Sequence, residues 1–259
     1  MGMVERRALL YQLVRRDFQQ RFVGSAAGWL WGVIHPLVLL ASWTFVFKIC
    51  LKMPSPRGEL TQDYVLFLFA GFLPWLLFQE TVTRSAGVLV EQANLITKTV
   101  FPSEVLPISV FLSSLVHHLI ALALVIGAIG IREGRVSPMI AWLPVYIFLV
   151  GMFAVGLSWV VSSLQVYLRD TAQIVSVTLT LWFWITPIFI SVDAIPAKLR
   201  FLVAWNPMSY LVKAYQDRLL STTWPAPNEL MIIAAAAAGM FLFGGLIFRH
   251  LKRGFADVL

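Results

Sequence analysis

The chain has 259 residues, of which 59% are hydrophobic and only 13% are charged. Soluble domains are about half apolar and about a quarter charged, so this composition excludes an ordinary soluble domain and indicates an integral membrane protein. The formal net charge of +7 is explained by basic loops beside a membrane, and we expect no nucleic-acid partner. Cys50 is the single cysteine, which excludes an intrachain disulfide and a cysteine-cluster metal site.

The first segment, residues 1–28, is predicted to form an amphipathic helix at the membrane surface. Tyr11, Val14, Phe18 and Phe22 fall on one helical face, and arginines occupy the other faces. Such a helix lies in the interface between lipid and water and does not cross the bilayer. Its arginines can attract anionic lipid, and the same helix can border a partner protein, so the two roles are compatible.

Six later stretches are long and apolar enough to cross a membrane, for which a helix needs about 20 residues. They are 29–51, 64–86, 105–131, 139–166, 172–192 and 229–249. An even number of spans places both termini on the same side. Eleven of the 20 Lys and Arg residues fall in segments that this layout places inside, namely Arg6, Arg7, Arg15, Arg16, Arg21, Arg84, Lys98, Arg169, Arg249, Lys252 and Arg253. Four of the other nine belong to one long outer connection, a kind that follows the positive-inside rule poorly, so we expect both termini in the cytoplasm.

The inner loop between the second and third spans contains a predicted short helix over residues 92–101. Its chemistry suits docking to another protein, because it offers a cap, an apolar face and a charged contact before Pro102 stops it. The residues concerned are Asn94, Leu95, Ile96, Lys98 and Phe101. The pattern alone fits an ordinary interfacial linker equally well.

The connection before the last span is long for a loop, yet it is not polar. Its prolines divide residues 193–224 into two short helical pieces, with a bend expected at Asn206-Pro207. We predict a re-entrant or surface-lying helical pair, which is tolerated only where protein or a water-filled cavity covers it. Trp205 and Tyr210 are expected to anchor the pair at the outer interface.

Aromatic residues make up 14% of the chain and include 10 Trp. Interfacial belts explain most of those near span ends. Trp75, Phe78 and Trp182 are placed deeper and need another explanation. Aromatic rings can give a sliding sugar chain an apolar platform. Packing between helices is the alternative, and the sequence pattern alone favours it.

Ionisable groups inside the spans have two interpretations each. Glu80 lies one helical turn before Arg84, and a structural pair between them is expected near the inner boundary. His117 and His118 fall near the middle of the third span. They can form hydrogen bonds between helices or take part in a proton relay, but no carboxylate lies near them in that span.

Several motifs of enzymes are absent from the sequence. There is no GxxxxGK[ST] loop, so we expect the chain itself to bind no ATP by that route. HExxH, GxSxG and His-rich ligand clusters are also missing, and we expect neither a catalytic residue nor a metal site.

Four stretches in order carry a recognisable family pattern. They are RDFQQRFVGSAAGWLWGVIHP at 16–36, NLITKTVFPSEVLPIS at 94–109, YLRDTAQIV at 167–175 and WNPMSYLVKAYQDRLL at 205–220. Together with the six-span layout, the chain resembles the membrane subunit of bacterial type-2 ABC exporters of lipid-linked polysaccharide, the O-antigen or teichoic-acid kind. Phe22 stands where many relatives have tyrosine.

The resemblance implies an all-α polytopic permease, with residues 1–259 forming one domain. It implies a homodimer that works with two copies of a separate subunit, which would bind ATP and Mg. The interface helix and the 92–101 coupling helix would contact that ATPase, aromatics would line a channel, and the 193–224 pair would form an outer gate. The residues concerned are Arg16, Asp17 and Arg21 for the interface helix, Trp31, Trp75, Phe78 and Trp182 for the channel, and Trp205, Asn206, Pro207 and Tyr210 for the gate.

The expected function is therefore export of a lipid-linked polysaccharide across the bacterial inner membrane. One alternative is the same fold exporting a small lipid or drug. A second is a membrane-embedded glycan-modifying enzyme, which would need acid, base or nucleophile groups clustered at one face, and the inner loops are too short to hold them. An ion-coupled carrier would require carboxylates in mid-membrane. O-antigen and teichoic-acid export are equally compatible with the residues.

Overall fold

The computed structural model describes residues 10–17, 30–52, 63–98, 101–190 and 195–258. Within these ranges every regular element is a helix, and no strand occurs. Among the described residues, four helical stretches are long and apolar enough to cross a membrane, so the predicted all-α membrane fold is confirmed at this level. They are Tyr64–Glu91, Val105–Glu133, Pro138–Tyr167 and Pro227–Gly254.

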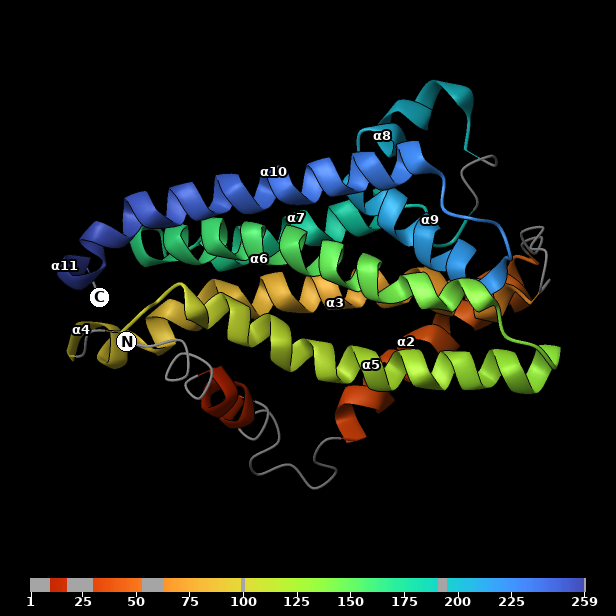
Figure 1. Ribbon diagram of the computed structural model, residues 1–259, viewed down its shortest axis with the longest axis horizontal. Coiled ribbons are helices and arrows are strands. Elements are labelled where there is room, and N and C mark those ends of the chain that lie inside the picture. The colour runs from red at the N-terminus through yellow and green to blue at the C-terminus, as the bar shows by residue number, and fades with distance from the viewer. Residues whose placement is uncertain (1–9, 18–29, 53–62, 99–100, 191–194, 259) are drawn as a thin grey trace.

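The helix α3 (Tyr64–Glu91) lies at the centre of a bundle that runs along the long axis in Figure 1. Its neighbours include α5 (Val105–Glu133), α6 (Leu143–Tyr167), α7 (Thr171–Ile185) and α9 (Pro207–Leu220). This position explains its burial, since 72% of its apolar window is buried, against 17% in the last span, α10 (Pro227–Leu251). The apolar side chains that α10 exposes are what a lipid-facing helix presents.

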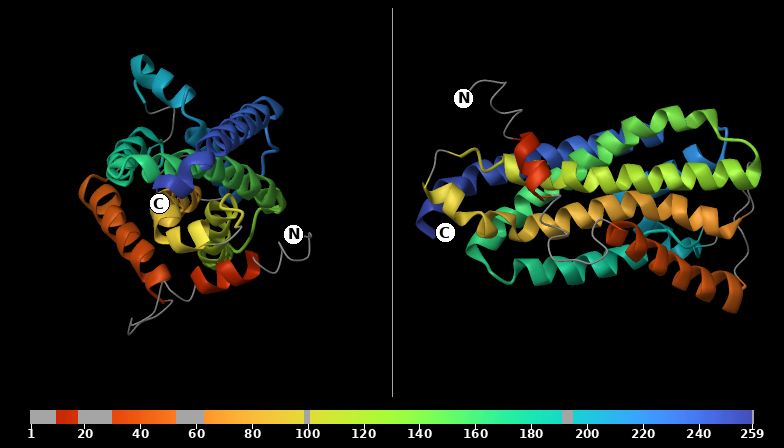
Figure 2. Two further views of the ribbon diagram at one scale, coloured as in Figure 1. Left: turned by 90° about the vertical axis from the view of Figure 1, so that its left-hand side faces the viewer. Right: turned by 90° about the horizontal axis from the view of Figure 1, so that it is seen from below.

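The first predicted span corresponds to α2 (Trp31–Trp43), which continues through the wider turns of a π-helix, η2 (Thr44–Cys50). The end-on view in Figure 2 shows this helix at the edge of the bundle. Trp43 holds it against the core, because its ring lies 4.7 Å from that of Phe72 on α3 and 5.2 Å from that of Phe183 on α7, between centroids. This contact of Trp43 is made by aromatic rings and is confined to its immediate neighbours.

The fifth apolar helix, α7, is shorter than the sequence predicts. The expected span covers 172–192, whereas the helix stops at Ile185. Thr186 has an extended backbone and precedes Pro187, which lacks an N–H and disfavours helical geometry in the residue before it. The 15 residues of α7 reach about 22 Å, less than the roughly 30 Å thickness of a bilayer core.

Between α7 and α10 the chain forms two short helical pieces. The first is η5 (Ala197–Leu199) with α8 (Arg200–Ala204), and the second is α9. The bend between them falls at Asn206-Pro207. α9 is buried along most of its length against α3, α6 and α10, so it is inserted into the bundle, as Figure 1 shows.

One end of the bundle, called here the inner end, collects the segments that the sequence predicts on the inner side. These are the helix over residues 10–17, α4 (Ala93–Lys98), the turn at 168–170, and α11 (Phe255–Val258), all to the left in Figure 1. η6 (Lys252–Gly254) joins α10 to α11, and Lys252 pairs with Glu104 at 2.6 Å. At the opposite, outer end, η3 (Pro138–Trp142) leads into α6.

A small apolar cluster at the inner end ties the 10–17 helix to the bundle. Its buried members include Leu13, Val88, Leu89 and Phe255. Leu13 was not on the predicted apolar face, whereas Tyr11, which was, is 68% exposed. The bundle-facing side of this helix therefore differs from the one that the pattern indicates. The rest of the predicted 1–28 segment lies outside the described residues.

Candidate functional site

A cavity of about 680 Å³ lies between α2, α3, α5 and α7. Part of its wall is aromatic and is formed by Trp31, Trp43, Phe72, Phe183 and Trp184. Another part is polar and includes Gln79, Glu80, Thr83, Arg84, His117 and Thr180. A wall that combines flat rings with hydrogen-bonding and charged groups suits a ligand that is itself partly polar and partly apolar.

A second cavity, of about 320 Å³, adjoins the first between α2, α3 and α5. The two share wall residues, which are Gly32, Phe72, Leu73, Leu76 and Ala121. Apart from Arg132 and Gly32, the lining of the second cavity is aliphatic or aromatic, with Leu37, Leu124 and Val125 among its members. The protein thus offers a polar and aromatic compartment next to an apolar one.

Gly32 allows α2 to approach α5 at this junction. A Cβ atom built on Gly32 would lie 2.8 Å from Nε2 of His117, and closer still to the ring carbon Cδ2. No side chain fits there without movement of the imidazole. The sequence contains this glycine in the first resemblance stretch, but nothing in its pattern indicates the contact with His117.

The four predicted channel aromatics separate into two groups. Trp31 is 53% exposed and lines the large cavity. Trp75 and Phe78 are fully buried, and their rings pack against Trp182 at 6.3 and 5.3 Å between centroids. Trp75 also contacts Phe183, a cavity residue, at 5.5 Å. In this conformation Trp75 and Phe78 lie behind the cavity wall and do not form it.

Asn206, at the bend of the outer helical pair, joins α9 to the end of α7 through three hydrogen bonds. Its Oδ1 accepts from the backbone N–H of Met208 at 3.0 Å, which caps α9, and from the indole N–H of Trp182 at 2.8 Å. Its Nδ2 donates to Oγ1 of Thr186 at 3.0 Å. The bend of the pair is therefore coupled to the end of α7. Trp205, by contrast, is 87% exposed.

Tyr210 stabilises the same bend from the other side. Its hydroxyl donates to the carbonyl oxygen of Ala204 at 3.0 Å, which joins α9 back to the end of α8. Pro207 occupies the first turn of α9, where its missing N–H costs no helical hydrogen bond. The predicted gate residues thus meet at one bend, although only Trp205 presents most of its surface outward.

At the inner end, the 10–17 helix contacts α3 through charged groups. Nη2 of Arg84 donates to Oδ1 of Asp17 at 2.6 Å, and the guanidinium of Arg16 bonds the side chain of Gln92. The sequence predicts an ion pair between Arg84 and Glu80; the structure instead gives Arg84 a partner from the amino-terminal helix, while both Glu80 and Arg84 line the cavity. Arg21 lies outside the described residues.

Within the predicted coupling segment, residues 92–101, the structure has the short helix α4 (Ala93–Lys98), and residues 99–100 lie outside the described residues. Asn94 and Lys98 are exposed, whereas Leu95 and Ile96 are half-buried. Ile96 and Phe101 pack against the inner cluster. Asn94 lies inside the first turn and does not cap the helix, because α3 continues to Glu91 and α4 begins at Ala93.

His118 joins α5 to α9, since its Nε2 lies 3.1 Å from the hydroxyl oxygen of Tyr215, with both side chains buried. This contact matches the predicted hydrogen bonding between helices. His117, the next residue, lines the large cavity, and so does His118. The two histidines share this cavity but contact different helices, since His118 pairs with Tyr215 of α9 and His117 lies against Gly32 of α2.

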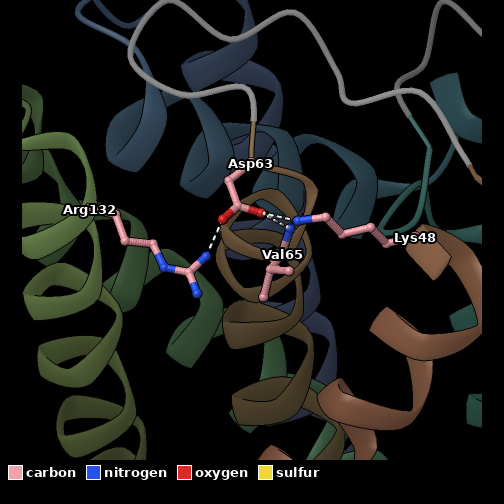
Figure 3. Close-up of polar contacts among 4 residues, drawn as sticks. All are labelled: Lys48, Asp63, Val65 and Arg132. Carbon is pink, nitrogen blue, oxygen red and sulfur yellow. Dashed lines mark hydrogen bonds and ion pairs between the residues drawn. The ribbon is translucent and has the colours of Figure 1, made fainter.

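At the outer end, Asp63 holds η2, α3 and α5 together (Figure 3). Its Oδ1 accepts from Nζ of Lys48 and from the backbone N–H of Val65, both at 3.0 Å, and its Oδ2 pairs with Arg132. Partial burial tends to raise the pKa of this carboxyl. The hydrogen bonds and the charges of Lys48 and Arg132 outweigh burial, so the pKa lies below its ordinary value.

Sequence reasoning missed several cavity residues. Gln79, Thr83 and Thr180 were not singled out, and neither was Trp184 as a wall residue. A signal existed on α3, because the polar residues Gln79, Glu80, Thr83 and Arg84 recur on one helical face, at intervals of three and four residues. Such a polar stripe within a span indicates a face turned toward protein or water.

Comparison with known families identifies the class of protein to which this fold and this cavity belong. The family described as ABC-2 type transporter matches residues 8–220, and the chain belongs to this family.

Among characterised relatives, the O-antigen export system permease protein RfbA of Klebsiella pneumoniae is 28% identical over 254 residues, which cover 97% of this chain and 95% of that protein. RfbA of Myxococcus xanthus is 29% identical over the same shares. The capsule polysaccharide export inner-membrane protein CtrC of Neisseria meningitidis is 23% identical over 203 residues, or 76% of this chain and 73% of CtrC. All three are similar to this chain over most of their length.

Proposed function

We propose that this chain is the membrane subunit of an exporter that moves a lipid-linked polysaccharide outward across the bacterial inner membrane, driven by a separate ATPase. The observation that carries the proposal is the aromatic and polar cavity joined to an apolar one. Sugars stack on flat rings and bond to amides and carboxylates, while a lipid chain needs an aliphatic surface. Full-length similarity to O-antigen export permeases supports the same substrate class.

The proposed topology has six spans, with α2–η2 and α7 added to the four long helices, and both termini in the cytoplasm. The grouping of the basic inner segments at one end of the bundle supports it. Cys50→Ser removes the only cysteine, after which Asn94→Cys and Ser221→Cys can be probed on intact cells with an impermeant thiol reagent. Ser221→Cys should label from outside, and Asn94→Cys only after the membrane is opened; the opposite pattern rejects the topology.

The working unit would be a homodimer with two ATPase copies that bind ATP and Mg. α7 exposes a stripe at helical spacing, formed by Ile174, Val177, Leu181 and Trp184, and a second permease subunit would cover part of it. Exposed Asn94 and Lys98 on α4, together with the half-buried Leu95 and Ile96, Phe101 and the 10–17 helix, would contact the ATPase. Arg16 and Asp17 then carry its motion to α3.

We assign Trp31 direct contact with the glycan, because it is exposed at the cavity. Trp75, Phe78 and Trp182 form the layer behind the wall, and a movement of α7 would bring them to the path. The bend at Asn206-Pro207 would act as the outer gate, because Asn206 bonds the end of α7 while Trp205 faces outward. The outer gate and the glycan path would thus both respond to a movement of α7.

A small amphiphile is the second candidate substrate, because the apolar cavity by itself could hold a lipid or drug. Complementation separates the two. The chain and its ATPase partner are expressed in a bacterium whose own O-antigen permease gene is deleted, with a hydrolysis-defective ATPase as the control. Restored surface polysaccharide supports glycan export. Accumulation of lipid-linked glycan inside, together with new drug resistance, would reject glycan export in favour of the second candidate.

A further inference from the structure

Arg84 is a cation in the wall of the large cavity whose pairing is incomplete. Nη2 bonds Oδ1 of Asp17 at 2.6 Å, whereas Nη1 is buried and has no hydrogen-bond partner among the described residues. A guanidinium has five N–H donors in a planar fork that matches the oxygens of a phosphate or carboxylate. One carboxylate oxygen of Asp17 therefore uses only part of what Arg84 offers.

The surroundings of Arg84 favour an amphiphilic anion over a small soluble one. On the same helix, Gln79 and Thr83 add hydrogen-bonding groups to the wall. Beyond the shared residues Leu73 and Leu76 lies the apolar cavity, which suits a hydrocarbon chain. A ligand that places a phosphoryl headgroup at Arg84 and its chain in the apolar cavity satisfies both compartments.

We propose that Arg84 binds the phosphoryl headgroup of a lipid ligand, and that Asp17 is an internal competitor that occupies Arg84 when the ligand is absent. The choice of a lipid-linked ligand rests on the proposed export function. Asp17 belongs to the helix expected to contact the ATPase. Movement of that helix withdraws the carboxylate and leaves the guanidinium available to the headgroup.

This competition makes ligand binding and helix position interdependent. The negative charges of the headgroup and of Asp17 repel one another at Arg84, so each weakens the binding of the other by the same factor. Substrate arrival at the cavity is thereby signalled to the 10–17 helix, and ATPase movement in turn changes the affinity of the cavity. Glu80 lines the same wall one helical turn away, and capture of the released Arg84 by Glu80 is the rival outcome.

Binding is measured on the full chain in phosphatidylcholine nanodiscs, by calorimetry and by tryptophan fluorescence, since Trp31, Trp43 and Trp184 line the cavity. The probes are farnesyl diphosphate, farnesol and inorganic pyrophosphate, which separate the contributions of headgroup and chain. We expect farnesyl diphosphate to bind at least about tenfold more tightly than either of the others. Equal binding of farnesol would overturn the anion site, and equal binding of pyrophosphate would overturn the lipid source.

Two single variants test the competition. Arg84→Gln should weaken farnesyl diphosphate binding at least about tenfold, because a charge-assisted hydrogen bond is lost. Asp17→Asn should strengthen it about threefold or more, because the competitor is removed while a side chain of the same shape remains. Neither variant should change the binding of farnesol. Unchanged affinity in Asp17→Asn would show that Asp17 does not compete or that Glu80 captures Arg84, and would overturn the proposal.

A charge swap separates this role from a structural ion pair. Asp17→Arg combined with Arg84→Asp keeps opposite charges in contact, so thermal stability should stay near that of the unmodified chain. In this double variant the cavity wall no longer carries the guanidinium at position 84. We therefore expect the binding of farnesyl diphosphate to fall as in Arg84→Gln. Full binding by the swapped protein would overturn the assignment of Arg84.

The complementation assay distinguishes failure of this inference from failure of the proposed function. Normal glycan export by Arg84→Gln would overturn the headgroup assignment and leave the export function in place. An unmodified chain that binds farnesyl diphosphate through Arg84 but exports no glycan would support the headgroup site and contradict glycan export.

Discussion

Gly156 of α6 and Gly244 of α10 meet backbone against backbone. A Cβ atom built on Gly156 would lie 2.5 Å from the carbonyl oxygen of Met240, and one built on Gly244 would overlap the carbonyl group of Gly156. Small residues at a helix crossing let backbones approach closely, and the resulting van der Waals packing is one of the forces that associate helices in a membrane. This crossing holds α10, whose other faces are largely exposed.

We therefore predict that Gly244→Ala destabilises the protein by about 1–3 kcal/mol, because a methyl group in a filled crossing forces the helices apart. Gly239→Ala on the same helix is the matched control, since nothing lies within 4 Å of its added Cβ atom and alanine favours helix. Thermal unfolding in detergent measures both. Equal midpoints for the two variants would show that the close crossing is unimportant.

Asp63 gives a prediction with a defined pH dependence. Its pKa is lowered in the folded protein, so its charge stabilises the fold fully above the unfolded pKa of about 3.9, and this contribution is lost as the pH falls through the folded pKa. Asp63→Asn keeps a capping side chain and removes the charge. It should cost up to about 1 kcal/mol at pH 7, and the difference should vanish in acid.

Asp63→Ala separates the cap from the charge at the same position. It removes the acceptor for the N–H of Val65 as well, which adds about 1 kcal/mol of destabilisation. That part should persist at low pH, where a protonated aspartate still accepts the bond. Thermal midpoints of the unmodified chain and the two variants across the acid range test both parts. A pH-independent cost of Asp63→Asn, or equal costs of the two substitutions in acid, would contradict the account.

Lys98 tests the proposed contact with the ATPase. It is exposed on α4, so Lys98→Glu should leave the fold intact while it reverses a charge at the contact. We expect severalfold lower export and ATPase stimulation in the complex, with a thermal midpoint close to normal. Arg135→Glu, an exposed charge reversal at the outer end, is the control. Equal effects of the two substitutions would remove the case for α4 as the coupling element.

Trp31 and Trp75 should respond in opposite ways to truncation. Trp75 is fully buried, so Trp75→Ala should destabilise the protein by about 3–5 kcal/mol. Trp31 is exposed at the cavity, and Trp31→Ala should slow export severalfold with little loss of stability. Paired export and unfolding measurements decide the matter. Strong destabilisation by Trp31→Ala with normal export would make Trp31 a packing residue.

The sequence was sufficient to predict the all-helical membrane fold, because the lengths of apolar runs depend on the bilayer alone. The predicted helix ends were less accurate, because tertiary packing and proline also determine where a helix ends. α3 continues beyond the predicted end at 86, since Val88 and Leu89 are buried with Leu13, a residue distant in the chain. α7 ends early because Pro187 interrupts it, a signal that was present but was outweighed by the apolar run.

The site could be predicted less well, because the direction in which a side chain points and its pairing with a distant residue depend on the tertiary structure. Depth in a span identified Trp75 as unusual, but it did not say that the ring faces the core. The helical interval indicated Glu80 as the partner of Arg84, whereas Asp17, 67 residues away, forms the ion pair. The bend at Asn206-Pro207 was predictable because proline chemistry is local.

The central claim, ATP-driven export of a lipid-linked polysaccharide, is tested most directly by reconstitution. The chain is placed in liposomes with its ATPase partner and a lipid-linked O-antigen glycan, and the glycan that reaches the opposite leaflet is measured with a membrane-impermeant lectin. We predict transfer that requires ATP, the ATPase and this chain together, with only background ATP hydrolysis by the chain alone. ATP hydrolysis by the pure chain, or no glycan transfer by an actively hydrolysing complex, would contradict the account.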